Sequence, residues 1–105
     1  MTAYVVVEVT ITDPQGYAAY LAAGQREILA LYGGRLLVVD GSPEILEGQW
    51  PHTRTVLIEF PSKDKARQWY ESPEYRAVAG LRHEAAHANL VIVEALPGID
   101  PGQSG

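Results

Sequence analysis

The chain has 105 residues, 47% hydrophobic and 20% charged, a composition typical of one soluble globular domain. Its net charge of −5 disfavours binding to nucleic acid or to an anionic membrane surface, since both need clustered cations. The absence of cysteine excludes disulfides, thiolate metal sites and a cysteine nucleophile. Because neither a signal peptide nor an apolar stretch of membrane-spanning length is visible, we expect a cytoplasmic protein.

Alternation of apolar and polar residues predicts four strands, and helical periodicity follows the first and the third of them. The predicted strands are Tyr4–Ile11, Arg35–Asp40, Thr55–Phe60 and Asn89–Leu96. A strand–helix–strand pattern that occurs twice is typical of a ferredoxin-like βαββαβ sandwich. This is an α+β fold in which a four-stranded antiparallel sheet carries its helices on one face. We expect one domain over residues 1–97 and a disordered tail over residues 98–105.

The first helix is predicted to begin at Asp13 and Pro14 and to end at Gly33 and Gly34. An aspartate N-cap accepts hydrogen bonds from free N–H groups, and a proline in the first helical position loses none. Gly24 lies within the apolar stripe of this helix, where we expect it to permit close approach to the sheet. One glycine of the terminal pair is expected in the left-handed conformation of a helix C-cap.

Residues 42–52 form a long connection between the second and third strands, and long ordered loops often carry function. The second helical region is predicted as a short helix over Lys63–Tyr70 and a longer one over Pro73–Ala86. Ser62 and Ser72 are the expected N-caps of these two helices.

Several short motifs carry a resemblance to known proteins. They are Asp13-Pro14 followed by Tyr17 and Tyr20, then Tyr32-Gly33-Gly34-Arg35, Glu47-Gly48-Gln49-Trp50 and Trp69-Tyr70-Glu71-Ser72-Pro73-Glu74-Tyr75. From about Tyr4 to Leu96 the chain resembles an uncharacterised bacterial family catalogued as domain of unknown function 1330. The resemblance implies the dimeric α+β barrel superfamily, in which two ferredoxin-like protomers oppose their helix-free sheet faces. It supplies no activity, because none is established for the family. Relatives in the superfamily include monooxygenases, isomerases and haem-degrading enzymes, which suggest chemistry by analogy only.

The helix-free face of the sheet is expected to be too apolar to face water. The residues predicted on it include Tyr4, Val6, Leu57, Leu90 and Ile92. A second copy of the chain that covers this face with the same surface is the simplest closure. We therefore predict a homodimer, independently of the resemblance.

Three residues are candidate acid–base catalysts. Glu8 and Glu59 are predicted on the helix-free face, near the C-terminal ends of two parallel central strands. Two carboxylates close together would not both ionise, so they would form an acid–base pair; alternatively, both face solvent. His52 lies in the long loop, near Trp50 and Arg54, where a general base would be useful. The alternative for His52 is a solvated loop residue.

Candidate ligand-binding residues combine aromatic rings that carry polar tips with two guanidinium groups. They are Tyr17, Tyr20, Arg54, Trp69, Tyr75 and Arg82. Arg54 and Arg82 could each hold a carboxylate or enolate through a bidentate fork. A small aromatic or carboxylated metabolite would suit this lining. Alternatively, the aromatic residues belong to the core and Arg54 pairs with Glu47.

The segment from His83 to His87 matches H-E-x-x-H, the helix signature of metalloproteases. A catalytic zinc site needs a third protein ligand, and only a strand and a tail follow His87. We therefore expect no metal and two exposed histidines near a helix C-terminus. The chain has no nucleotide-binding or hydrolase motif, so no cofactor is expected; haem binding is implied only by analogy with the superfamily.

These patterns favour two classes of function. The first is a homodimeric α+β barrel protein that binds a small organic metabolite between the sheet and the helices or the long loop. Cofactor-independent proton transfer or oxygenation is the candidate chemistry of that class. The second is a non-enzymatic small-molecule-binding or interaction module.

Overall fold

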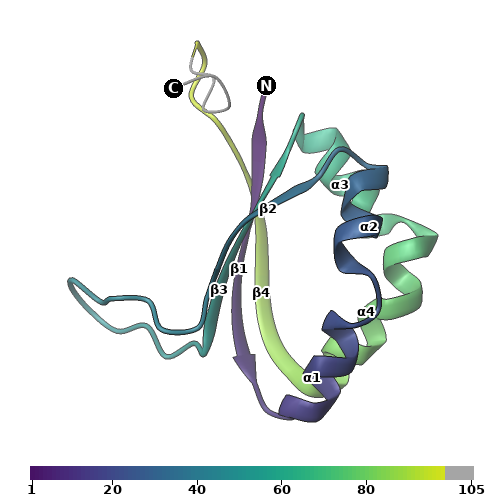
Figure 1. Ribbon diagram of the computed structural model, residues 1–105. Helices are drawn as coiled ribbons and strands as arrows, with labels where there is room; N and C mark the ends of the chain where they lie inside the picture. The colour runs from purple at the N-terminus through teal and green to yellow at the C-terminus, as the bar shows by residue number, and fades with distance from the viewer. Residues whose placement is uncertain (99–105) are drawn as a thin grey trace.

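The computed structural model describes residues 1–98 and shows an open sheet with its helices packed on one face (Figure 1). The elements are β1 (Ala3–Ile11), α1 (Pro14–Leu21), α2 (Gln25–Leu31), β2 (Arg35–Asp40), β3 (Arg54–Phe60), α3 (Lys63–Glu71), α4 (Pro73–Ala85) and β4 (Ala86–Glu94). This confirms the ferredoxin-like α+β fold. Of the helices within residues 1–98, none combines the length and apolar character needed to cross a membrane. Beyond Gly98, the predicted tail lies outside the described residues.

The strand order is β2-β3-β1-β4, and every neighbouring pair is antiparallel. The prediction that β1 and β3 are parallel is wrong, because the β2–β3 connection reverses the chain after the first crossover. Across this ladder Glu8 faces Thr55, whereas Glu59 faces Tyr4. Glu59 is thus four residues along β3 from the partner of Glu8, about 13 Å at about 3.3 Å per residue. The two carboxylates do not form the predicted acid–base pair.

One face of β1 packs beneath the helices, as its alternating pattern predicts. The buried residues of this face are Ala3, Val5, Val7 and Val9. Val5 and Val7 lie opposite Ile58 and Val56 of β3, so the central strands share one apolar layer. That layer forms the core together with the aromatic side chains of β3 and the helices.

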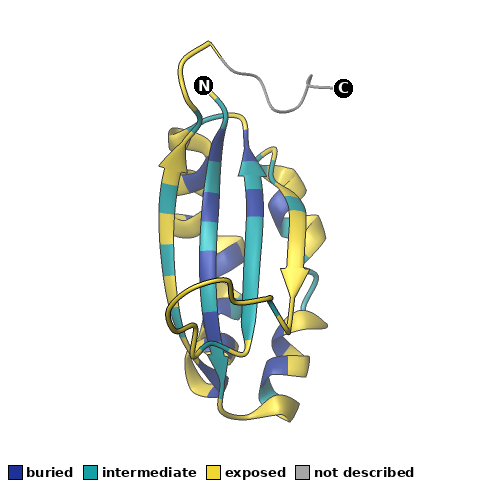
Figure 2. Cartoon of the chain, turned by 90° about the vertical axis from the view of Figure 1, so that its left-hand side faces the viewer, coloured by how far each residue is buried: buried dark blue, intermediate teal, exposed yellow. Residues whose placement is uncertain are grey.

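No helix covers the opposite face of the sheet (Figure 2), which carries both apolar residues and polar ones such as Glu8, Glu59 and Asn89. Leu90 and Ile92 do not belong to it, contrary to prediction, because they pair with Val7 and Val5 and point toward the helices. The pairing of β4 with β1 instead places Val91 and Val93 of β4 on the side away from the helices, opposite Val6 and Tyr4. We call the resulting set the helix-free face: Tyr4, Val6, Val38, Leu57, Val91 and Val93. Val91 and Val93 are 54% and 43% exposed.

The predicted first helix is two helices, α1 and α2, separated at Gly24. Gly24 has φ +83°, a left-handed conformation that only glycine adopts readily. The nearest atom to the position of an added Cβ is a carboxylate oxygen of Glu27 at 3.5 Å. Gly24 therefore serves the chain reversal between two helices, and the prediction that it allows close approach to the sheet is wrong.

The helix ends follow local rules in most places. Gly33 has φ +75°, and the N–H of Gly34 donates to the carbonyl of Leu29 at 2.8 Å, a glycine C-cap as predicted. Ser62 and Ser72 cap α3 and α4 as predicted. Asp13 occupies the N-cap position of α1, but its carboxylate accepts no hydrogen bond from the helix, so that part of the prediction is wrong.

Candidate functional site

The sequence-predicted site residues fall into two groups on opposite faces of the sheet. The residues predicted to bind a ligand lie between the sheet and the helices. The three predicted acid–base residues belong to the helix-free side, where Glu59 pairs with Arg35 at 2.9 Å and Glu8 with His52. A single cavity that holds both a base and an anion clamp is therefore not formed between sheet and helices.

All six predicted ligand-binding residues line one cavity of about 80 Å³ beneath the helices. They are Tyr17 and Tyr20 of α1, Arg54 of β3, Trp69 of α3, and Tyr75 and Arg82 of α4. We call this space the arginine cavity. Most of its other walls are apolar side chains, but Gln25 also contributes, and sequence reasoning missed it. No sequence pattern singled it out.

Arg82 is only 5% exposed, and no carboxylate of residues 1–98 forms an ion pair with it. Its Nε donates to the hydroxyl of Tyr75 at 3.1 Å, and that hydroxyl shares a hydrogen bond of 2.9 Å with Tyr20. Its Nη2 lies 3.2 Å from Nε2 of His83. Burial lowers the pKa of Arg82, but the neighbouring tyrosines, Tyr75 foremost, outweigh this and raise it. The guanidinium therefore stays charged.

Arg54 is the second cation of the cavity. Its Cζ lies 5.2 Å from the centroid of the Tyr17 ring, a cation–π contact. It does not pair with Glu47, and its buried Nε has no hydrogen-bond partner. Nε1 of Trp69 is likewise buried without a partner. Leaving a buried donor unpaired costs about 1–3 kcal/mol, so an acceptor that reached either N–H group would be bound favourably.

Tyr17 and Tyr20 keep their phenolic protons, so neither is available as a base. Burial raises the pKa of Tyr17, although Arg54 partly offsets the effect. Burial and the hydroxyl of Tyr75 raise the pKa of Tyr20 far above its ordinary value. None of the described residues that line the cavity carries a carboxylate or an imidazole. The arrangement can hold an anion, but its own walls supply no ready base.

A larger groove of about 720 Å³ runs along the edge strand β4. It shares Trp69, Arg82 and Leu90 with the arginine cavity. On the side of the helices the groove is lined by Ala66, Tyr70 and Ile92. It continues around the edge of β4 to His52 and other residues on the opposite side of the sheet. We call it the β4 groove.

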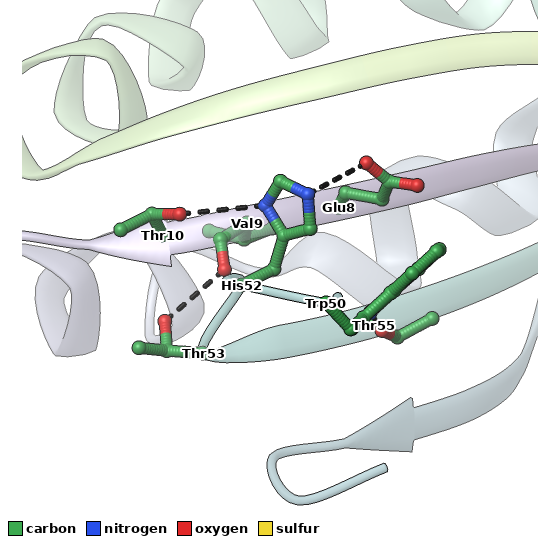
Figure 3. Close-up of polar contacts among 7 residues, drawn as sticks. All are labelled: Glu8, Val9, Thr10, Trp50, His52, Thr53 and Thr55. Atoms are coloured by element: carbon green, nitrogen blue, oxygen red, sulfur yellow. Dashed lines mark hydrogen bonds and ion pairs between the residues drawn. The ribbon is translucent and has the colours of Figure 1, made fainter. Parts of the chain in front are cut away.

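The helix-free side holds a polar cluster built around His52 (Figure 3). Nε2 of His52 lies 2.9 Å from a carboxylate oxygen of Glu8, and Nδ1 lies 3.4 Å from the hydroxyl of Thr10. The ring of Trp50 stands edge-on to the imidazole at 5.5 Å. His52 is thus fixed on β1 and is not the solvated loop residue given as the alternative.

The backbone next to His52 ties the long loop to the sheet. The hydroxyl of Thr53 donates to the carbonyl of Val9 at 3.1 Å and accepts from the N–H of Ile11 at 2.8 Å. Trp50 donates through Nε1 to the hydroxyl of Thr55 at 2.9 Å. The cluster therefore holds the end of this loop across the helix-free side, where Figure 2 shows it in front of the sheet.

The H-E-x-x-H match is divided between two elements. α4 ends at Ala85, and Ala86 is extended with φ −160°, so His83 is on the helix and His87 is in β4. The single helix that this signature requires is therefore absent, and both histidines are exposed next to the C-terminal end of α4, as predicted. Within residues 1–98 no group of three or more histidine or acidic side chains is arranged to hold a metal ion.

Comparison with solved structures gives the same fold at low sequence identity. A protein of unknown function from Rhodopseudomonas palustris is 20% identical, with 90% of this chain and 82% of that chain covered and a TM-score of 0.67. A dimeric ferredoxin-like protein of unknown function from Jannaschia sp. CCS1 is 12% identical, with 90% and 100% covered and a TM-score of 0.65.

SnoaB, a cofactor-independent oxygenase from Streptomyces nogalater, is 14% identical, with 93% of this chain and 96% of that chain covered and a TM-score of 0.63. At such identities the likeness concerns the fold alone. No curated protein matches the chain. The model of one family, the Domain of unknown function (DUF1330), matches residues 2–96, and the chain therefore belongs to that family.

Proposed function

We propose that this protein is a homodimer that binds a small organic carboxylate in the arginine cavity. The observation that carries the proposal is the pair of guanidinium groups that line one small space without a carboxylate partner in residues 1–98. An unpaired buried charge is costly, and a ligand carboxylate would supply the missing counter-ion. Carboxylate oxygens also match the forked N–H donors of arginine.

The remaining walls of the cavity support an organic anion over an inorganic one. Leu29, Val56 and Ile58 contribute apolar surface, and Tyr17 and Trp69 contribute rings. Such surface gains from contact with an apolar ligand body, which phosphate or sulfate lacks. Nε1 of Trp69 offers one further donor to the ligand.

A non-enzymatic binding role is favoured over catalysis because the cavity walls hold no ready base. The second candidate is cofactor-independent proton transfer or oxygenation, since two cations would also stabilise an enolate. The fold shared with SnoaB, a cofactor-independent oxygenase, supports this candidate by analogy only. In that case proton removal would fall to a group outside the arginine cavity.

We expect Arg54→Gln to weaken the binding of benzoate, measured by isothermal titration calorimetry. A hydrogen bond between charged partners contributes about 1.5–3 kcal/mol, so the dissociation constant should rise about 10- to 100-fold. Arg76→Gln is the matched control, because Arg76 lies on the exposed side of α4 and should leave binding unchanged. Equal affinity of wild type and Arg54→Gln, or no binding of benzoate to the wild type, would contradict the proposal.

The homodimer rests on the helix-free face, which is apolar and uncovered by any helix. Two solved neighbours, from Jannaschia sp. CCS1 and Thermobifida fusca, are described as dimeric ferredoxin-like proteins. A two-fold partner would bury the same patch on both subunits.

We expect Val91→Lys to convert the dimer to a folded monomer in sedimentation velocity at micromolar concentration. Val91 lies opposite Val6 on the helix-free face, and a buried lysine would place two like charges in the interface. Leu31→Lys is the control, because Leu31 lies on α2 and is 64% exposed. A monomeric wild type at the same concentration would overturn the dimer.

A further inference from the structure

The arginine cavity is too small to hold a metabolite by itself. It measures about 80 Å³, whereas cavities that enclose organic ligands commonly measure about 300–1,000 Å³. An acid about the size of benzoate would fill it. The rest of any larger ligand must lie in a neighbouring space.

The β4 groove is that neighbouring space. Trp69, Arg82 and Leu90 line both the groove and the cavity, so the two spaces adjoin at these three side chains. The groove measures about 720 Å³, nine times the cavity volume. Arg82 marks the junction: its Nε meets Tyr75 of the cavity and its Nη2 meets His83 of the groove.

Part of the helix-side wall of the groove is apolar, and Arg67 and His83 also border it. Its members Val5, Ala66, Leu90 and Ile92 carry no polar side-chain atom. Tyr70 borders the groove with an exposed fraction of 43%, and its ring lies 6.1 Å from that of Trp69. An exposed aromatic ring above an apolar wall gains from contact with a hydrocarbon chain or ring.

We infer that the ligand is an elongated carboxylate, with its anionic end in the arginine cavity and an apolar chain or ring several atoms away in the β4 groove. This inference rests on the proposed function and adds the class of ligand to it. The charged end is recognised by Arg54 and Arg82, and the apolar end by the wall of β4 and α3.

The test compares benzoate, 3-phenylpropionate and 4-phenylbutyrate by isothermal titration calorimetry with the full chain. Each added methylene group that reaches the groove should lower the dissociation constant about fourfold. Tyr70→Ala should weaken 4-phenylbutyrate about tenfold or more and leave benzoate unchanged. Trp50→Ala is the control, because Trp50 is a partly exposed aromatic residue outside the groove.

The outcomes separate this inference from the proposed function. If benzoate binds and the longer acids bind no better, the elongated ligand is wrong while the carboxylate site stands. If Tyr70→Ala is folded and weakens the binding of benzoate as much as that of 4-phenylbutyrate, the apolar end of the ligand does not lie in the groove. If none of the three acids binds, the proposed function fails and this inference fails with it. The length series needs only the wild type, so it decides the question even where a variant does not fold.

Discussion

Arg82→Met is expected to make the unliganded protein more stable and to abolish its stabilisation by carboxylates. Arg82 is 5% exposed and has no carboxylate partner within the part of the chain that the structure describes. Methionine occupies a similar length without a charge, and the hydroxyl of Tyr75 keeps the hydroxyl of Tyr20 as a partner. The free energy of unfolding should rise by about 1–2 kcal/mol, because buried ionic groups are often replaced by apolar ones with a gain in stability.

The measurement is a thermal melt with and without 4-phenylbutyrate. In a domain of this size about 1 kcal/mol shifts Tm by about 4–8 °C, so the unliganded variant should melt roughly 5–15 °C above the wild type. Added ligand should raise Tm of the wild type and leave that of the variant unchanged. Arg76→Met, at an exposed site, should change neither quantity. An Arg82→Met protein that melts below the wild type would show that Arg82 holds the fold together.

Phe60→Ala is expected to have the largest effect on stability. Phe60 is fully buried at the end of β3, and its ring centroid lies 5.6 Å from that of Trp69. Its ring also lies against Gly34, where an added Cβ would come within 2.7 Å of it. Truncating such a side chain leaves a cavity and costs about 3–5 kcal/mol, a large part of the 5–15 kcal/mol by which typical domains are stable.

Urea unfolding followed by circular dichroism would measure this loss as a lower transition midpoint with little change of slope. Leu46→Ala is the control: it removes a leucine that is 90% exposed in the long loop, so it should change stability by less than about 0.5 kcal/mol. Equal midpoints for Phe60→Ala and the wild type would contradict the core described above. Phe60→Ala should lower the free energy of unfolding, whereas Arg82→Met should raise it. This difference distinguishes a residue that maintains the fold from one that lowers stability and binds ligand.

The sequence by itself determined the features that depend on neighbouring residues. Ser62 and Ser72 cap their helices, and Gly33 ends α2, because each acts on backbone groups within a few positions. The alternation along β1 identified its buried face for the same reason. The aromatic rings with polar tips and the guanidinium groups of Arg54 and Arg82 were enough to select six of the residues that line the arginine cavity.

Tertiary structure decided everything that depends on strand direction and register. Successive side chains of a strand point to opposite faces of the sheet, so a shift of one residue in pairing moves every side chain to the other face. The observed register of β4 against β1 places Leu90 and Ile92 beneath the helices. The antiparallel β1–β3 ladder separated Glu8 from Glu59. The meeting of His52 with Glu8 and the lack of an ion-pair partner for Arg82 also depend on segments far apart in the chain. Local propensity carries no information about such contacts, because packing between distant elements fixes them.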